Sequence, residues 1–157
     1  MRFTTKQDIE APLDFVYSTM IDFEAWERSA MRRGAEVERT DTLTRIGPGM
    51  SWAARFSYRG KVRSVALRLV MIEPRAALSF AAQSQAVEGA VKLDLMEMTA
   101  RRTRVHVVAE VTPRSLASRL FLQSLRLARG RVDRKFEQRV AQLASDIERR
   151  FQALRKS

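Results

Sequence analysis

The stretch MSWAARFSYRGKVRSVALRLVM, residues 50–71, decides the fold class, because apolar and polar residues alternate along both of its halves. Alternation with a period of two is typical of a β-strand that buries one face. Gly60, between the halves, favours a hairpin turn. On the first half, one face carries Met50, Trp52, Ala54, Phe56 and Tyr58. We therefore predict two antiparallel strands that share one apolar face.

The same period extends outward from this hairpin, from residue 35 to residue 112. A GPG turn at residues 47–49 separates the hairpin from an expected strand over residues 35–43. Further apolar strands follow around Leu78 and Phe80, over residues 91–95 and over residues 105–111, with short polar connections between them. Short connections join antiparallel neighbours. The pattern predicts a meander of about six strands.

The residues before the meander predict one more strand and two short helices. Residues 3–9 alternate as a strand does, and this strand would close the sheet. Pro12 is tolerated in the first turn of a helix and precedes the apolar run LDFVYSTMI. Asp22 can cap a second helix, which Gly34 would end in a left-handed conformation.

The carboxy-terminal part predicts one long helix over residues 115–155. Ser115 can cap it, and apolar residues recur every three or four positions from Leu116 to Leu154. A straight helix of about 40 residues would be ~60 Å long, whereas a compact domain of this size is roughly 40 Å across. Either the helix bends at Gly130, its weakest helix former, or it overhangs. In the second case its distal stripe, Val140, Leu143, Ile147 and Phe151, would pack on a second copy and form a homodimer.

Composition narrows the class of protein. The chain has 157 residues and no linker-like segment, so we expect one domain over residues 1–157. It has no cysteine and a single histidine, His106, and lacks a glycine-rich phosphate loop. We therefore predict no metal and no cofactor. The amino terminus lacks the apolar core of a signal peptide, and we expect a cytoplasmic location.

The net charge of +11 calls for an explanation. Residues 115–157 contain eleven basic and four acidic side chains, so most of the excess lies in the predicted long helix. A basic helix attracts anionic membranes and nucleic acids. Few aromatic residues interleave with these arginines, which favours peripheral membrane contact over nucleic acid. The alternative is a solvated helix face with no partner.

Three segments resemble one known family. IEAPLDFVYSTMIDFEAW (residues 9–26), GPGMSW (residues 47–52) and IEPRAALSF (residues 72–80) are similar to the START-like, or Bet v 1-like, superfamily, in particular its polyketide cyclase/dehydrase and lipid-transport branch. The resemblance covers nearly the whole chain. It implies the α+β helix-grip fold, in which a curved antiparallel sheet of about seven strands wraps around a long carboxy-terminal helix. It also implies a cavity between sheet and helix, which relatives use for lipids, polyketides and other apolar molecules.

The expected cavity supplies the candidate ligand-binding residues. Trp52, Phe56 and Tyr58 offer flat apolar area, and ordinary core positions are their alternative role. Thr5, Gln7 and Ser124 are the polar candidates; the alternatives are a strand end in water for the first two and a bond to its own helix for Ser124. The full set is Thr5, Gln7, Trp52, Phe56, Tyr58, Leu67, Leu69, Phe80, Leu93, Leu95, Val107, Leu120, Phe121, Ser124, Leu125 and Ala128.

These residues favour a protein that binds a hydrophobic or amphipathic small molecule. No catalytic motif of the cyclases can be matched residue by residue, so a cyclase or dehydratase using the same cavity is the alternative. A membrane-surface protein is the third hypothesis. Arg39 and Asp41 share a strand face and would pair either at the cavity mouth or on the surface, and His106 is expected on the outer face.

Overall fold

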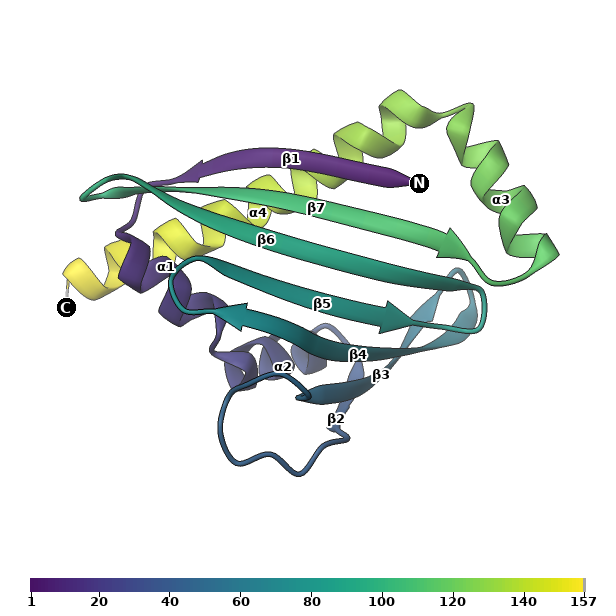
Figure 1. Ribbon diagram of the computed structural model, residues 1–157, viewed down its shortest axis with the longest axis horizontal. Coiled ribbons are helices and arrows are strands. Elements are labelled where there is room, and N and C mark those ends of the chain that lie inside the picture. The colour runs from purple at the N-terminus through teal and green to yellow at the C-terminus, as the bar shows by residue number, and fades with distance from the viewer. Residues whose placement is uncertain (157) are drawn as a thin grey trace.

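Seven strands form one antiparallel sheet in the computed structural model, which describes residues 1–156 (Figure 1). Ser157, the last residue of the expected domain, lies outside the described residues. The order across the sheet is β1-β7-β6-β5-β4-β3-β2, so β1 and β2 are the edges. The strands are β1 (Arg2–Ile9), β2 (Glu36–Arg39), β3 (Ser51–Tyr58), β4 (Lys61–Glu73), β5 (Ala77–Gln83), β6 (Val87–Thr99) and β7 (Arg102–Pro113). The predicted meander, closed by the amino-terminal strand, is confirmed.

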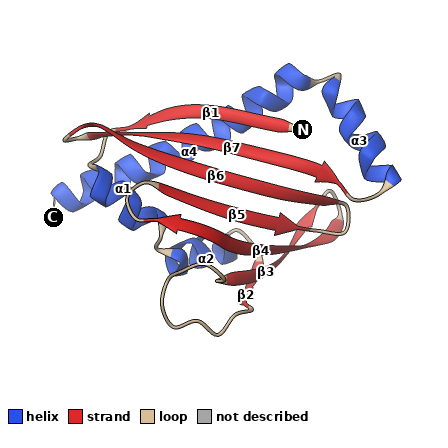
Figure 2. Cartoon of the chain, viewed as in Figure 1, coloured by secondary structure: helices blue, strands red, loops and turns tan. Residues whose placement is uncertain are grey.

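Four helices accompany the sheet (Figure 2). The predicted short pair is α1 (Leu13–Met20) and α2 (Phe23–Arg32), and the carboxy-terminal pair is α3 (Leu116–Arg126) and α4 (Arg129–Arg155). Asp22 Oδ1 accepts a hydrogen bond from the Ala25 amide at 3.3 Å, and Ser115 forms a capping box with Ser118. Both predicted caps therefore hold their helices. The curved sheet with a long carboxy-terminal helix is the helix-grip α+β architecture.

The hairpin turn predicted at Gly60 joins β3 to β4. Arg59 and Gly60 both have positive φ angles, 51° and 76°. Two successive residues with positive φ form the turn whose twist matches that of the flanking strands. The hairpin pairs Trp52 with Leu67 and Tyr58 with Lys61, as the alternation predicts.

The predicted continuous helix over residues 115–155 is wrong, because the chain turns at Leu127 and Ala128 and forms two helices. Gly130, the expected bend point, lies inside the first turn of α4 instead. The start of α4 is fixed to β1: Arg129 lies over the Phe3 ring, with its guanidinium carbon 4.8 Å from the ring centroid, and donates a hydrogen bond to the Arg2 carbonyl. α4 alone, at 27 residues and ~1.5 Å per residue, spans ~40 Å.

The core lies where α1 and α4 cover one end of the sheet. Its fully buried side chains include Ile9, Val16, Leu78, Val105 and Ile147. The whole distal stripe of α4, Val140, Leu143, Ile147 and Phe151, belongs to this core or packs against it. The stripe is therefore occupied by the chain itself and is not available to a second copy.

Two strands depart from the predicted pattern. β2 ends at Arg39 rather than at residue 43, because the Asp41 carboxylate accepts hydrogen bonds from the Leu43 and Ser51 amides and turns the backbone. β4 contains a bulge between Leu69 and Met71. Beyond it Ile72 pairs with Leu78, so Ile72 rather than Met71 continues the buried face.

Within residues 1–156, the helices are too short or too polar to cross a bilayer.

The assignment of Ile147 to the core predicts that alanine substitutions at Ile147 and at the exposed Leu127 change the free energy of unfolding by very different amounts. Ile147→Ala removes a side chain with 0% exposure and is expected to lower the free energy of unfolding by ~2–5 kcal/mol. Leu127→Ala, at a position with 92% exposure, is expected to change it by less than ~0.5 kcal/mol. Urea unfolding followed by circular dichroism measures both. Similar losses in the two variants would contradict the assignment of the α4 stripe to the core.

Candidate functional site

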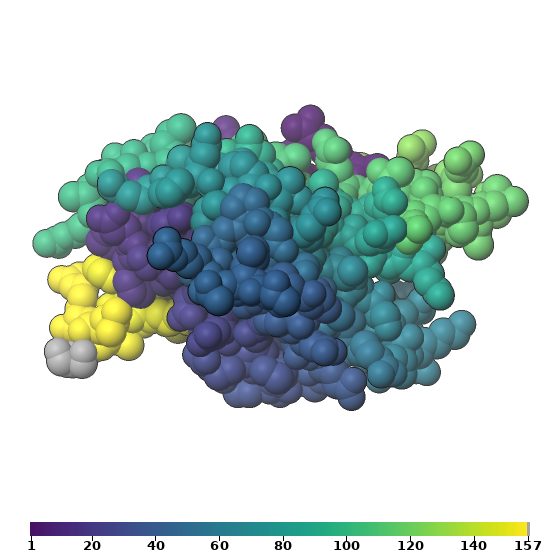
Figure 3. Space-filling view, turned by 60° about the horizontal axis from the view of Figure 1, so that its bottom comes forward, coloured from purple at the N-terminus to yellow at the C-terminus, as the bar shows by residue number. Residues whose placement is uncertain are grey.

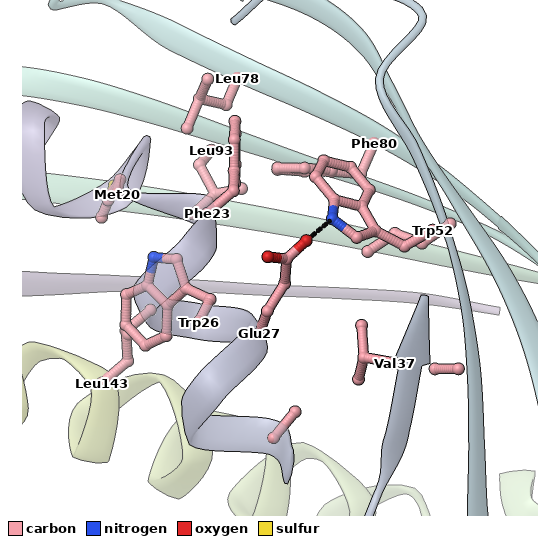
Figure 4. A pocket seen from close by; sticks show the side chains of 13 residues that line it. Met20, Phe23, Trp26, Glu27, Val37, Trp52, Leu78, Phe80, Leu93 and Leu143 are labelled. Carbon is pink, nitrogen blue, oxygen red and sulfur yellow. Dashed lines mark hydrogen bonds between the residues drawn. The ribbon is translucent and has the colours of Figure 1, made fainter. Parts of the chain in front are cut away.

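A cavity of about 380 Å³ lies between α2, the concave face of the sheet and α4 (Figure 4). The covering helices contribute residues from α1, α2 and α4, and the sheet contributes residues from β2 to β6. The lining residues are Met20, Phe23, Trp26, Glu27, Ala30, Val37, Trp52, Ala54, Leu67, Leu78, Phe80, Leu93 and Leu143. Twelve of these thirteen side chains are apolar or aromatic, so the cavity suits an apolar molecule.

Aromatic contacts fix the wall between α2 and the sheet. The Phe23 ring packs against the Trp52 ring at 5.2 Å between centroids and against the Phe80 ring at 6.2 Å, both edge to face. Such contacts between rings add to the stabilisation from burial. Phe23 comes from the first turn of α2, so the Asp22 cap that starts this helix also places the ring. The wall is therefore set by local sequence on one side and by strand register on the other.

Glu27 is the one charged side chain among the cavity-lining residues of the described chain. Its Oε1 accepts a hydrogen bond of 2.7 Å from Trp52 Nε1, and Figure 4 shows this bond crossing from α2 to the sheet. The other indole N–H in the wall, of Trp26, donates to the Thr19 carbonyl at 3.0 Å. Within residues 1–156 no donor reaches Glu27 Oε2. This oxygen is the acceptor that the cavity can offer to a ligand.

Arg39 and Asp41 form the predicted ion pair beside Trp52. Arg39 Nε and Nη2 reach the two Asp41 carboxylate oxygens at 2.8 and 2.6 Å, and the guanidinium carbon lies 5.8 Å from the Trp52 ring centroid. The hydrogen bond from Arg39 holds the pKa of Asp41 well below its usual range, and the Ser51 and Leu43 amides lower it further. Asp41 in turn raises the pKa of Arg39, and the negative charge of Glu27 raises it further. The pair therefore supports the strand that carries Trp52.

The structure brings four of the predicted site residues to the cavity: Trp52, Leu67, Phe80 and Leu93. Their role in binding stays a prediction. Leu69 and Val107 are instead buried in the core at 0% and 5% exposure, and Leu95 packs against that core. These three residues pack in the core or against it and do not line the cavity.

Two further groups of predicted residues lie outside this cavity. Phe56 and Tyr58 continue the Trp52 face of β3 toward the hairpin tip, where they are exposed. Thr5 and Gln7 bond to each other, Gln7 Nε2 donating to Thr5 Oγ1 at 3.2 Å, beside a separate polar pocket on β1. His106, expected on the outer face, lines that same polar pocket.

The predicted site residues of the carboxy-terminal helix lie away from the cavity as well. Leu120 and Phe121 are exposed, and Ser124 Oγ donates to the Phe121 carbonyl of its own helix at 2.7 Å. Leu125 and Ala128 are half-buried near the turn between α3 and α4. The physical reason is that turn, which directs α3 away from the concave face.

Sequence reasoning missed the contribution of α2 to the cavity. Phe23, Trp26, Glu27 and Ala30 recur at spacings of three, one and three, so they occupy one face of the helix. That spacing is a signal that could have found them. Val37, Ala54, Leu78, Met20 and Leu143 complete the lining. Among residues 1–156, no three acidic or histidine side chains gather as metal ligands would.

Comparisons with known proteins agree with the geometry. No protein-family model matches the chain, and neither does a curated protein sequence. Solved structures do match. TTHA0849 from Thermus thermophilus superposes with a TM-score of 0.68 at 16% identity, over 98% of this chain and 99% of that one. Zhui aromatase/cyclase from Streptomyces sp. R1128 gives 0.66 at 15% identity, over 96% and 94%.

A START superfamily protein from Mycobacterium smegmatis is also similar, with a TM-score of 0.57 at 11% identity, over 87% of this chain and 97% of that one. At these identities the likeness concerns the fold alone. The chain has a START/Bet v 1-like fold, as the resemblance of its sequence predicts.

The Arg39–Asp41 pair yields a pH prediction. Arg39→Met removes the strongest cause of the lowered Asp41 pKa, so this pKa is expected to rise toward its ordinary value of ~3.9, with the two amides retaining part of the lowering. A carboxyl group with a lowered pKa stabilises the fold above its unfolded-state pKa of ~3.9 and loses that contribution as the pH falls through the folded-state value. The variant is therefore expected to lose less stability than the wild type on acidification. Carboxyl ¹³C NMR titration and urea unfolding at several pH values measure the two effects.

Arg104→Met is the matched control, because Arg104 lowers the pKa of Asp8 and does not touch Asp41. It should move the Asp8 titration alone. An Asp41 titration that is the same in wild type and Arg39→Met would contradict the pairing.

Proposed function

We propose that the protein binds an apolar small molecule carrying a hydrogen-bond donor, in the cavity between α2 and the concave face of the sheet. The observation that carries the proposal is an apolar cavity of about 380 Å³ with a single carboxylate in its wall. Ligand cavities in proteins typically have volumes of roughly 300–1,000 Å³, with few polar groups that orient the ligand. The lipid- or polyketide-like ligand class predicted from the sequence fits such a lining.

The energetics favour apolar ligands of moderate affinity. Each 100 Å² of apolar ligand surface removed from water contributes ~2.5 kcal/mol before ordering costs. The Glu27 carboxylate is expected to discriminate between polar ends of such ligands. A hydroxyl or an ammonium group could donate to Oε2, whereas a ligand carboxylate or phosphate would face a like charge without a compensating donor.

The same carboxylate supports a second candidate function, an enzyme of the cyclase or dehydratase type. A carboxylate within hydrogen-bond reach of a bound molecule can accept or donate a proton during a reaction. One structural neighbour is named an aromatase/cyclase, which favours considering catalysis in this cavity. The two functions differ in a readout: a binding protein releases its ligand unchanged, and an enzyme releases a product of altered structure. Chromatography and mass spectrometry of a ligand released from wild type and from Glu27→Gln distinguish them.

Filling the cavity is expected to block binding. Ala54 lines the cavity, whereas Ala53 lies on the opposite face of the same strand. Ala54→Phe should weaken the binding of the neutral probe N-phenyl-1-naphthylamine about tenfold or more, which corresponds to ~1.4 kcal/mol. Fluorescence titration measures the change, and Ala53→Phe is the matched control. Equal affinities for wild type and a folded Ala54→Phe variant would place the probe elsewhere.

Glu27 is expected to set the preference for the polar end of the ligand. In competition against the same probe, dodecylamine should bind about tenfold more tightly than dodecanoate, because hydrogen bonds to a charged group contribute ~1.5–3 kcal/mol. Glu27→Gln should remove this preference. Glu24→Gln removes the same charge from an exposed position of α2 and should keep it. Tighter binding of dodecanoate than of dodecylamine to the wild type would refute this role of Glu27.

A further inference from the structure

One end of the molecule exposes an apolar face that the fold does not cover. Leu116, Leu120, Phe121 and Leu127, in and directly after α3, are 73%, 58%, 52% and 92% exposed. The spacings of four and seven place Leu116, Leu120 and Leu127 on one side of the helix. The covered side of α3 holds Ser118, its one buried residue. α3 is therefore an amphipathic helix whose apolar side faces solvent.

The β3–β4 hairpin tip lies at the same end. Figures 1 and 3 place both α3 and this tip toward one end of the long axis, on the right of both views, with the two apart from each other in Figure 3. The tip exposes Phe56, Tyr58 and Val62 at 36%, 49% and 62%. We name residues 55–63 and 114–131 together the α3 end. The α3 end exposes seven large apolar side chains in two parts of the surface.

The charge of the α3 end is of one sign. Residues 114–131 contain five arginines, residues 55–63 contain four basic residues, and neither range contains an acidic residue. Arg114, Arg129 and Arg55 pair with acidic side chains from outside these ranges, Glu88, Asp133 and Glu36. Within the described residues, the other six basic side chains form no ion pair: Arg59, Lys61, Arg63, Arg119, Arg126 and Arg131. Exposed apolar groups are thus surrounded by uncompensated positive charge.

We propose that the α3 end docks on the surface of an anionic phospholipid bilayer. An amphipathic helix with aliphatic residues on one side and arginines beside them inserts its apolar side at the boundary between headgroups and acyl chains, while the arginines bind anionic headgroups. A second copy of this chain would bring like charges together at the same apolar face. Nucleic acid would use the arginines but leave Leu116, Leu120 and Leu127 without a partner. The bilayer satisfies both features at once.

The docked orientation would bring the hairpin end of β3 to the membrane. Trp52 and Ala54 line the cavity, and Phe56 and Tyr58 continue the same face of β3 into the α3 end. An apolar molecule could therefore move between bilayer and cavity along one strand face. The docking itself does not depend on the proposed ligand, because it rests on surface residues alone.

Vesicle sedimentation tests the proposal with the full chain. Wild-type protein should sediment with vesicles of phosphatidylcholine and phosphatidylglycerol, less so as salt is raised, and not with phosphatidylcholine alone. Arg119→Gln/Arg126→Gln should weaken partitioning about 25-fold, since each arginine near an anionic surface contributes a factor of about five. Leu120→Ser/Leu127→Ser keeps the charge and should weaken it at least about tenfold through lost apolar burial.

Arg68→Gln/Arg101→Gln is the matched control. It removes two exposed arginines from other parts of the surface and should keep most of the binding. Circular dichroism verifies that every variant is folded. The proposal is overturned if anionic vesicles do not bind the wild type, or if the control loses as much binding as Arg119→Gln/Arg126→Gln. It is also overturned if Leu120→Ser/Leu127→Ser binds as the wild type does.

Two further measurements identify the rival partners. Tight binding of a labelled single-stranded DNA that depends on Arg119 and Arg126, without vesicle binding, would assign the surface to nucleic acid and overturn the proposal. A wild-type dimer in analytical ultracentrifugation that Leu120→Ser/Leu127→Ser converts to monomer would assign it to self-association, with the same consequence.

Discussion

The architecture depends on one constraint: the concave face of the seven-stranded sheet carries large apolar side chains, such as Trp52, Leu69 and Val107, that have to be covered. α4, at ~40 Å, crosses beneath β1 and the neighbouring strands and covers one side. α1 and α2 cover the other side at the same end of the sheet. Where these helices do not meet the sheet closely, a cavity remains between Phe23, Trp52 and Leu93. The candidate site is thus a direct consequence of how this face is covered.

Patterns with a short range in sequence predicted most of the fold. The alternation around Trp52, the turn at Gly60 and the caps at Asp22 and Ser115 depend on residues close in the chain, and the structure contains all of them. The bulge in β4 and the early end of β2 were not predicted. Both depend on contacts with neighbouring strands, such as the bond from the Ser51 amide to Asp41, which spacing alone does not reveal.

The candidate site was predictable only in part, for a related reason. Residues on central strands, such as Leu67 and Phe80, face the concave side whichever helix covers it. Which helix covers that side depends on tertiary packing. The periodicity of residues 115–155 continues through the turn at Leu127, so it predicted a single helix over the whole sheet. In the structure α2 forms the wall instead and brings Glu27 to Trp52, a contact across 25 residues. That contact gives the cavity its polar group.

The most direct test of the cavity as a binding site is to locate a bound probe by intermolecular nuclear Overhauser effects. With N-phenyl-1-naphthylamine at saturation and methyl-labelled protein, we expect contacts from the probe rings to methyl groups of Leu78, Leu93 and Leu143, which line the cavity. Contacts confined to Leu116, Leu120 and Leu127 of the exposed α3 face would contradict the account. So would a bound probe without contacts to any cavity methyl group.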